Sequence, residues 1–189
     1  MITGILLAAG AATRFGSQKL LARLPDGRRM VETSATNVLT ACAGNVVAVT
    51  RRDDELIEVL ESTGCRIVIN EHAEQGMGTS IAVGVAASAD ATGWLIALGD
   101  MPWIRVDTVA TLVDALRESG GTKIVVPVFS GQRGHPVGFT GNYRARLQSL
   151  TGDSGAREIL KSNAKFVEEI SVDDAGIFAD VDTRADLER

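Results

Sequence analysis

Short apolar runs alternate along the chain with segments in which apolar residues recur at helical spacing. The runs are apolar at consecutive positions, which is typical of strands that are buried on both faces of a parallel sheet. They lie at residues 5–8, 46–49, 67–69, 94–98 and 124–128. Each run therefore predicts a strand that is covered by helices on both sides.

The segments between these runs have the period of amphipathic helices. In residues 105–118 the apolar positions fall on one stripe with charged residues opposite, as in a helix that covers a sheet. The predicted helices span residues 30–43, 54–63, 77–89 and 105–118. Because strands and helices alternate without a linker or an internal repeat, we predict one α/β domain over residues 1–189 with a mostly parallel sheet.

Composition and charge argue against some classes of ligand. The 189 residues carry a formal net charge of −5, which argues against a nucleic-acid platform or a binder of anionic membranes. A small anionic substrate stays compatible with this charge, because a few local cations suffice to bind it. The apolar runs are too short to span a bilayer and the N-terminus has no basic leader, so we expect a cytoplasmic protein. Two cysteines and two histidines offer neither a disulfide framework nor a histidine-rich metal cluster.

The loop after the first predicted strand is rich in small residues and carries two cations. It contains Leu7, Ala8, Ala9, Gly10, Arg14 and Lys19. A glycine turn at a strand end can bring backbone N–H groups close to a phosphate, and an arginine and a lysine add charges that suit a triphosphate. The spacing matches neither a Walker A loop nor a dinucleotide fingerprint. A plain glycine turn with two exposed cations therefore remains the alternative.

Two aspartates are candidate metal ligands. Asp100 directly follows the fourth predicted strand, where an unpaired carboxylate is costly to desolvate and is usually paired or bound to a cation such as Mg²⁺. Asp182 lies in the segment 180–183, and it would share one face with Asp180 if that segment is a strand. The alternative for both is structural, because an aspartate in either place could cap a following turn or helix.

Three further loops contain candidate binding residues. Gly78 and Ser80 lie where a glycine loop opens the predicted helix 77–89, a place where N–H groups and a hydroxyl can contact a ligand. His135 lies between a glycine and a proline, and it is either an acid/base or phosphate-binding group or a structural hydrogen-bonding residue. Arg157 follows a glycine turn at a helix start, where it offers an anion contact or belongs to a capped surface turn.

Taken in order, these loops resemble one family. The matching segments are 7–19, 75–80, 99–102, 134–136, 152–157 and 180–183. They are similar to the motifs of the MobA/MocA-like nucleotidyltransferases, and most of all to those of the molybdenum cofactor cytidylyltransferases. The opening motif alone is shared with sugar-phosphate nucleotidyltransferases, but the six ordered segments extend the resemblance over essentially the whole chain.

This resemblance implies a Rossmann-like fold of the GT-A type, with helices on both faces of a mostly parallel sheet that has one reversed strand. It implies transfer of CMP from CTP to the phosphate of a molybdopterin-type cofactor, with Mg²⁺ as the metal and pyrophosphate as the second product. A molybdoenzyme or a cofactor chaperone would be the partner that receives the product. Another base or acceptor (GTP, a sugar phosphate or phospholactate), or a non-catalytic nucleotide-binding protein of the same fold, remains the alternative.

The resemblance also implies a role for each candidate residue. The catalytic residues would be Lys19, Arg14 and Asp100, with Asp100 and Asp182 holding Mg²⁺. The nucleotide would contact Leu7, Ala8, Ala9, Gly10, Arg14, Lys19, Gly78 and Ser80, and the acceptor would lie beside His135 and Arg157. The first loop departs from the family pattern at two positions, where Ala12 replaces the usual serine and Phe15 the usual methionine.

Overall fold

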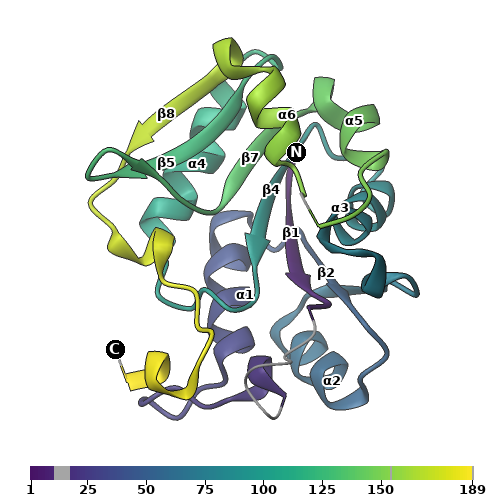
Figure 1. Cartoon of the computed structure of the whole chain (residues 1–189), viewed down its shortest axis with the longest axis vertical. Helices are drawn as coiled ribbons and strands as arrows, with labels where there is room; N and C mark the ends of the chain where they lie inside the picture. Colours follow the sequence, from purple (N-terminus) through teal and green to yellow (C-terminus); the bar gives the residue numbers. More distant parts are fainter. Residues whose placement is uncertain (11–17, 154, 189) are drawn as a thin grey trace.

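Eight strands of the described residues form one sheet, with the order β3-β2-β1-β4-β7-β5-β6 and with β8 beside β5 (Figure 1). The computed structural model describes residues 1–10, 18–153 and 155–188. The strands are β1 (Ile2–Ala8), β2 (Val46–Thr50), β3 (Arg66–Ile69), β4 (Gly93–Leu98), β5 (Ile124–Phe129), β6 (Gln132–Arg133), β7 (Val137–Thr140) and β8 (Val167–Ser171). All five predicted strands are confirmed, as β1 to β5.

The strand directions give a mixed but mostly parallel sheet. Strands β1 to β4 are parallel, and β5 is parallel to β8. Strand β7 lies antiparallel between β4 and β5, and the two-residue β6 forms a second reversed strand in a hairpin with β5. The parallel register places Ala8 beside Thr50 and Leu7 beside Leu98. The carboxyl ends of β1, β2 and β4 therefore meet at one edge, where ligands bind in open sheets of this kind.

Helices cover both faces of the sheet, as the alternating pattern predicts (Figure 1). They are α1 (Met30–Ala41), α2 (Asp54–Thr63), α3 (Met77–Ala86), α4 (Val106–Glu118), α5 (Arg144–Gln148) and α6 (Arg157–Ser162). Helices α1, α2 and α4 pack with one set of strand side chains, while α3, α5 and α6 pack with the set on the opposite face. Within the described ranges, no helix has both the length and the apolar character to cross a membrane.

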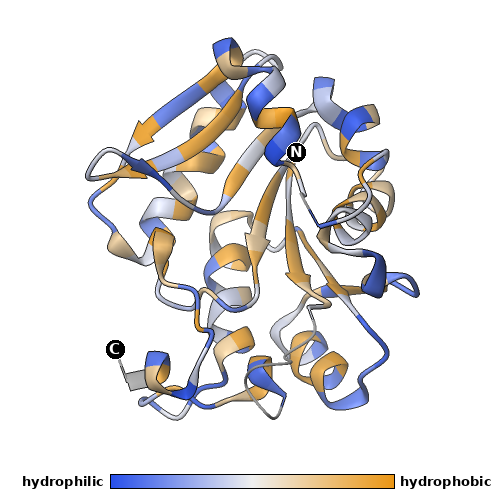
Figure 2. Cartoon of the chain, in the orientation of Figure 1, coloured by the Kyte–Doolittle hydropathy of each residue, from blue (hydrophilic) through white to orange (hydrophobic). Residues whose placement is uncertain are grey.

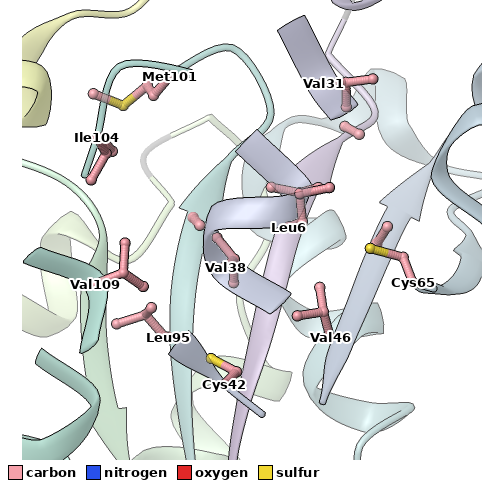
Figure 3. Close-up of a cluster of buried hydrophobic side chains, with 14 of the residues drawn as sticks. Leu6, Val31, Val38, Cys42, Val46, Cys65, Leu95, Met101, Ile104 and Val109 are labelled. Atoms are coloured by element: carbon pink, nitrogen blue, oxygen red, sulfur yellow. The ribbon is translucent and has the colours of Figure 1, made fainter. Parts of the chain in front are cut away.

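Aliphatic side chains fill the core between the sheet and its helices. Figure 2 shows the central strands as predominantly hydrophobic, with hydrophilic residues on the loops and the outer helices. Leu6 and Leu95 of the sheet meet Val38 and Cys42 from the α1 region in the cluster of Figure 3. Burial raises the pKa of the Cys42 thiol to about 12, and both Cys42 and Cys65 are free and buried. Both cysteines are therefore core residues, and neither forms a disulfide.

Candidate active site

The centre of the candidate site is a lysine held between two carboxylates. The ammonium nitrogen of Lys19 donates to Asp100 Oδ2 at 3.0 Å and to Asp182 Oδ1 at 2.9 Å. Lys19 begins a short 3₁₀ helix, Lys19–Leu21, just after the first loop, and Asp100 follows β4. Since β1 and β4 are neighbours in the sheet, the segments that follow them reach the same place. Sequence reasoning therefore finds all three residues, and the structure brings them together.

The electrostatics of this cluster favour a cation. Burial acts to lower the pKa of Lys19, but hydrogen bonds to Asp182 and Asp100 and the charges of both carboxylates outweigh it, so the pKa is raised. Only 12% of the lysine side chain is exposed, against 29% for Asp100 and 57% for Asp182. Two carboxylates with one ammonium leave this cluster with a formal net charge of −1. This charge favours the addition of a second, metallic cation.

The donor set fits Mg²⁺ that arrives with a phosphorylated ligand. Carboxylate oxygens are the ligands that Mg²⁺ prefers, and it commonly takes one or two of them and completes its shell with phosphate oxygens and water. Asp100 and Asp182 already converge on one cation, the lysine ammonium. In the described part of the chain there is no group of three or more His, Cys, Asp or Glu side chains placed to hold a metal. The residues thus fit a two-carboxylate site better than a complete protein cage.

Asp182 reaches the site from an irregular segment. The segment is not a strand, so the condition under which Asp180 and Asp182 would share one face is not met: residues 180–182 have no regular structure and a 3₁₀ helix, Arg184–Glu188, follows. The backbone N–H of Val181 donates to the carbonyl of Asp100 at 3.0 Å, and the Val181 side chain is completely buried. The N–H groups of Asp182 and Thr183 are capped by the carboxylate of Asp186. These contacts fix the backbone that presents Asp182 to Lys19.

A cavity of about 380 Å³ lies beside the ion cluster. Its lining includes the predicted residues Leu7, Ala9, Gly10, Lys19, Ser80 and Asp100. Arg51, just after β2, donates to the carbonyl of Gly10 at 3.3 Å and so ties the start of the first loop to the sheet edge. Arg14, Ala12 and Phe15 lie outside the described residues, so the predicted role of Arg14 stays a prediction.

Two predicted nucleotide contacts have another structural explanation. Ala8 is buried and belongs to the core cluster on the α1 side of the sheet. The N–H of Gly78 donates to the carbonyl of Gly152 at 2.8 Å, and a Cβ at position 78 would lie 2.7 Å from the backbone oxygen of Thr151. Gly78 therefore allows the start of α3 to pack closely against the 151–152 backbone. Neither residue lines the 380 Å³ cavity.

A second cavity, of about 690 Å³, adjoins the first, since Met77, Leu98 and Asp153 line both. His135 and Arg157, the two predicted acceptor residues, lie in its wall. Burial lowers the pKa of His135 and the charge of Arg157 acts in the same direction, whereas Asp100 and Asp180 act to raise it. Among the described residues, the buried Nδ1 atom of His135 has no hydrogen-bond partner.

Sequence reasoning missed several residues that line these cavities. Arg133 and Lys161 add two cations to the second cavity, and Glu74 and Asp153 add two carboxylates to the first. Lys161 lies four residues after Arg157, a spacing that places both on one side of a helix and could have indicated it. Glu74 lies in the 3₁₀ helix Ala73–Gln75, Asp153 in a loop and Arg133 in the two-residue β6, and no periodic pattern marks the direction of a side chain in segments this short.

The pattern of the MobA-like NTP transferase domain matches residues 4–167 of the chain. The chain belongs to the MobA-like NTP transferase family. Nucleotidyl transfer is thus the activity of its family, and the nucleotidyltransferase resemblance and fold predicted from the sequence are confirmed. The matched range ends before Asp182, which nevertheless contacts the lysine that also pairs with Asp100.

Curated relatives of this MobA-like chain have diverse names. Nicotine blue oxidoreductase of Paenarthrobacter nicotinovorans is 32% identical over 191 residues, which cover 96% of this chain and 92% of that protein. Purine catabolism protein PucB of Bacillus subtilis is 30% identical over 193 residues, with the same coverage of 96% and 92%. A probable molybdenum cofactor guanylyltransferase of Rhodopirellula baltica is 29% identical over 127 residues, 66% of this chain and 60% of that protein.

Among solved structures, Rv0371c of Mycobacterium tuberculosis superposes with a TM-score of 0.84 and 28% identity, covering 98% of this chain and 94% of that one. A second crystal structure of Rv0371c, a complex with manganese, gives a TM-score of 0.80 and 26% identity, covering 98% and 95%. This MobA-like chain therefore shares its fold with a protein that has been crystallised with manganese.

Proposed function

We propose that this MobA-like nucleotidyltransferase is an Mg²⁺-dependent cytidylyltransferase that transfers CMP from CTP to the phosphate of a molybdopterin-type cofactor and releases pyrophosphate. The observation that carries the proposal is the convergence of Asp100 and Asp182 on Lys19, where Lys19 and Asp100 line the first of two adjoining cavities. One cavity is of a size to hold a nucleotide and the other has basic and apolar walls that suit a large phosphorylated acceptor.

The residues of the first cavity would bind and orient the triphosphate. Lys19 is a compact positive charge that can neutralise phosphate oxygens, and Arg14 would add a planar donor pair on the same loop. Ala9 and Gly10 have small side chains or none, so the backbone can approach the nucleoside closely. In the transfer, an oxygen of the acceptor phosphate attacks the α-phosphorus while the bond to the bridging oxygen of pyrophosphate breaks.

Asp100 and Asp182 would hold Mg²⁺ together with phosphate oxygens of the donor. When bound there, Mg²⁺ supplies charge neutralisation for the triphosphate and for the pyrophosphate that leaves. The two carboxylates also hold the Lys19 ammonium, so they orient the cation that contacts the donor phosphates. The manganese complex of the related Rv0371c supports a divalent ion in this family.

The second cavity would hold the acceptor. Its apolar lining, which includes Ile96, Phe139 and Leu160, suits a flat ring system, while Arg133, Arg157 and Lys161 suit an acidic group. A phosphate monoester is already ionised near neutral pH, so the reaction requires no general base. His135, whose pKa is lowered by burial, would therefore contact the acceptor without serving as a base.

Two observations support the choice of base and acceptor. The Ala8-Ala9-Gly10 sequence of the first loop resembles the cytidylyl branch of the family, whereas the guanylyl branch typically has a Gly-Gly pair there. The molybdopterin-type acceptor is supported by the relative from Rhodopirellula baltica, whose name is that of a molybdenum cofactor enzyme. A molybdoenzyme or a cofactor chaperone would then receive the product.

The deciding experiment is an assay of pyrophosphate release with each of the four NTPs, with and without molybdenum cofactor. We expect release only with CTP, Mg²⁺ and the cofactor together. Release with GTP in place of CTP, or with a sugar phosphate in place of the cofactor, would overturn the finer assignment while keeping nucleotidyl transfer. No release with any NTP and acceptor would overturn nucleotidyl transfer itself and favour a binding protein.

The variant Asp100→Ala separates catalysis from folding in the same assay. Because Asp100 lies at the cavity wall and its side chain is 29% exposed, we expect the variant to fold and to lose Mg²⁺-dependent pyrophosphate release. Full activity of this variant would contradict the metal assignment.

A further inference from the structure

Behind the first cavity, a buried asparagine fixes the direction of a serine hydroxyl. Ser80 of α3 lines the cavity and is 4% exposed, while Asn70, just after β3, is 3% exposed and does not line it. We propose that Asn70 is a positioning residue that holds the Ser80 hydroxyl as a hydrogen-bond donor toward an acceptor atom of the nucleobase. This inference rests on the proposed function, because it takes the first cavity to be the nucleotide site.

The orientation of the Asn70 amide is set by its surroundings. Its Oδ1 accepts the backbone N–H of His72 at 3.0 Å, which only an oxygen can do. The Nδ2 group must then face the hydroxyls of Thr79 and Ser80, to which it donates at 2.9 and 3.0 Å. A flipped amide would place its own NH₂ group against the N–H of His72, so that two donors would face each other. Each polar group of the buried amide therefore has a partner, and the amide has one orientation.

This orientation determines what each hydroxyl can do. Both hydroxyl oxygens accept a hydrogen bond from Asn70, so each hydroxyl must donate its own O–H to a different acceptor. The Thr79 hydroxyl donates to the carbonyl of Gly76 at 2.8 Å or to that of His72 at 3.1 Å. Among the described residues no hydrogen bond is donated by Ser80. Because Ser80 lines the cavity, its O–H is left to donate to a ligand there.

The charges around Ser80 indicate which part of the nucleotide it meets. Glu74 and Asp153 line the same cavity, and the side chain of Asp153 lies next to Gly76 at the start of α3. These carboxylates disfavour phosphate at the α3 end of the cavity, whereas Lys19, together with a metal ion held by Asp100 and Asp182, would favour it beside the end of β4. The uncharged base therefore belongs beside Ser80. A donor at this point suits a carbonyl oxygen or an unprotonated ring nitrogen of the base.

The test compares the affinity for CTP with the affinity for inorganic triphosphate, both by calorimetry. Ser80→Ala removes the donor, and we expect a Kd for CTP about tenfold higher, the effect of losing one hydrogen bond to a buried partner. Asn70→Asp keeps the shape of the side chain but offers only hydrogen-bond acceptors. The Ser80 hydroxyl would then donate to the carboxylate at position 70 instead of to the base, and CTP binding would weaken to a similar extent. The Kd for triphosphate should stay within about twofold in both variants.

The double variant Asn70→Asp/Ser80→Ala and a control variant test whether Asn70 has a merely structural role. If Asn70 acts through Ser80, Asn70→Asp adds nothing to the CTP affinity of Ser80→Ala. Asn37→Asp is the matched control, since the Asn37 amide donates to the carbonyl of Ile104 on the other face of the sheet. It should leave the ratio of the two affinities unchanged, even if it lowers thermal stability.

The outcomes separate this inference from the proposed function. If pyrophosphate release fails with CTP, the same ratio is measured with the NTP that binds most tightly, and the inference stands or falls on that ratio. An unchanged ratio in Ser80→Ala would overturn it, as would additive losses in the double variant. Should Asn70→Asp not fold, the Ser80→Ala ratio still decides whether the hydroxyl donates to the base.

Discussion

Lys19, near the start of the chain, and Asp182, 163 residues later, form an ion pair in which the ammonium nitrogen and the carboxylate oxygen are 2.9 Å apart. The same ammonium contacts Asp100 at 3.0 Å, so one lysine joins the first loop, the end of β4 and the C-terminal segment. Asp182 is more exposed than Asp100, at 57% against 29%. Substitution of Asp182 and substitution of Asp100 should therefore have different effects on the protein.

Asp182→Asn should change the metal requirement and leave the fold intact. Exposed ion pairs contribute little to stability, so we expect the free energy of unfolding to fall by less than about 1 kcal/mol. With one carboxylate fewer, the Mg²⁺ concentration that gives half the maximal rate should rise about tenfold. A magnesium titration of pyrophosphate release measures this. Asp180→Asn, two residues earlier and also exposed, is the control and should not shift the titration.

Lys19→Met should have opposite effects on two ligands. The lysine ammonium occupies the place between the carboxylates, so its removal should let free protein bind Mn²⁺ about tenfold more tightly. The same change removes a cation from the triphosphate site, and the Kd for CTP should rise by about tenfold or more. Electron paramagnetic resonance of Mn²⁺ and calorimetry with CTP give the two values.

Lys123→Met provides the comparison for that variant, because Lys123 pairs with Glu168 at 3.6 Å on β8, outside both cavities. Neither affinity should change in it. If Lys19→Met lowers the affinity for Mn²⁺, the lysine does not compete with the metal, and the two-carboxylate site is wrong.

Strands β1 to β5, helices α1 to α4 and the edge where the site lies could be predicted from the sequence. Buried parallel strands are apolar at consecutive positions, and Lys19 and Asp100 follow strands that such a fold places side by side. Strand β8 was not predicted, because its residues 168 and 169 are both Glu and the strand is only partly buried at the sheet margin. An edge strand of this kind lacks the continuous apolar run on which the prediction depends.

The contact of Asp182 with Lys19 could not be predicted from the sequence, which indicated Asp182 only as a candidate metal ligand. It depends on one backbone hydrogen bond, from Val181 to Asp100, and on the burial of the Val181 side chain. Neither follows a period of two or 3.6 residues. Arg133 of the two-residue β6 and Asp153 of a loop likewise line the cavities from segments too short to show a period, where the direction of a side chain depends on tertiary packing.

Arg157→Ala should weaken binding of the acceptor and leave binding of CTP unchanged. Arg157 lines the second cavity, where its charge would meet an acidic group of the acceptor. Loss of one charge-assisted hydrogen bond should raise the KM for the acceptor about tenfold or more, with the Kd for CTP unchanged. Steady-state kinetics with a fixed, saturating CTP concentration measure it. Arg146→Ala on the neighbouring α5, where the guanidinium donates to Ser162, is the control; an equal effect there would contradict the assignment.

Substitution of two glycines on α3 should separate packing from binding. A Cβ at position 78 would lie 2.7 Å from the backbone oxygen of Thr151, and one at position 84 would lie 2.6 Å from Cγ2 of Ile5. Both Gly78→Ala and Gly84→Ala should therefore destabilise the fold, by about 1–3 kcal/mol in chemical denaturation. Only Gly78→Ala displaces the start of α3, next to Met77 and Ser80 of the first cavity, so only it should also weaken CTP binding. Equal loss of CTP affinity in both variants would mean that the close contact with Thr151 has no special part in shaping the nucleotide site.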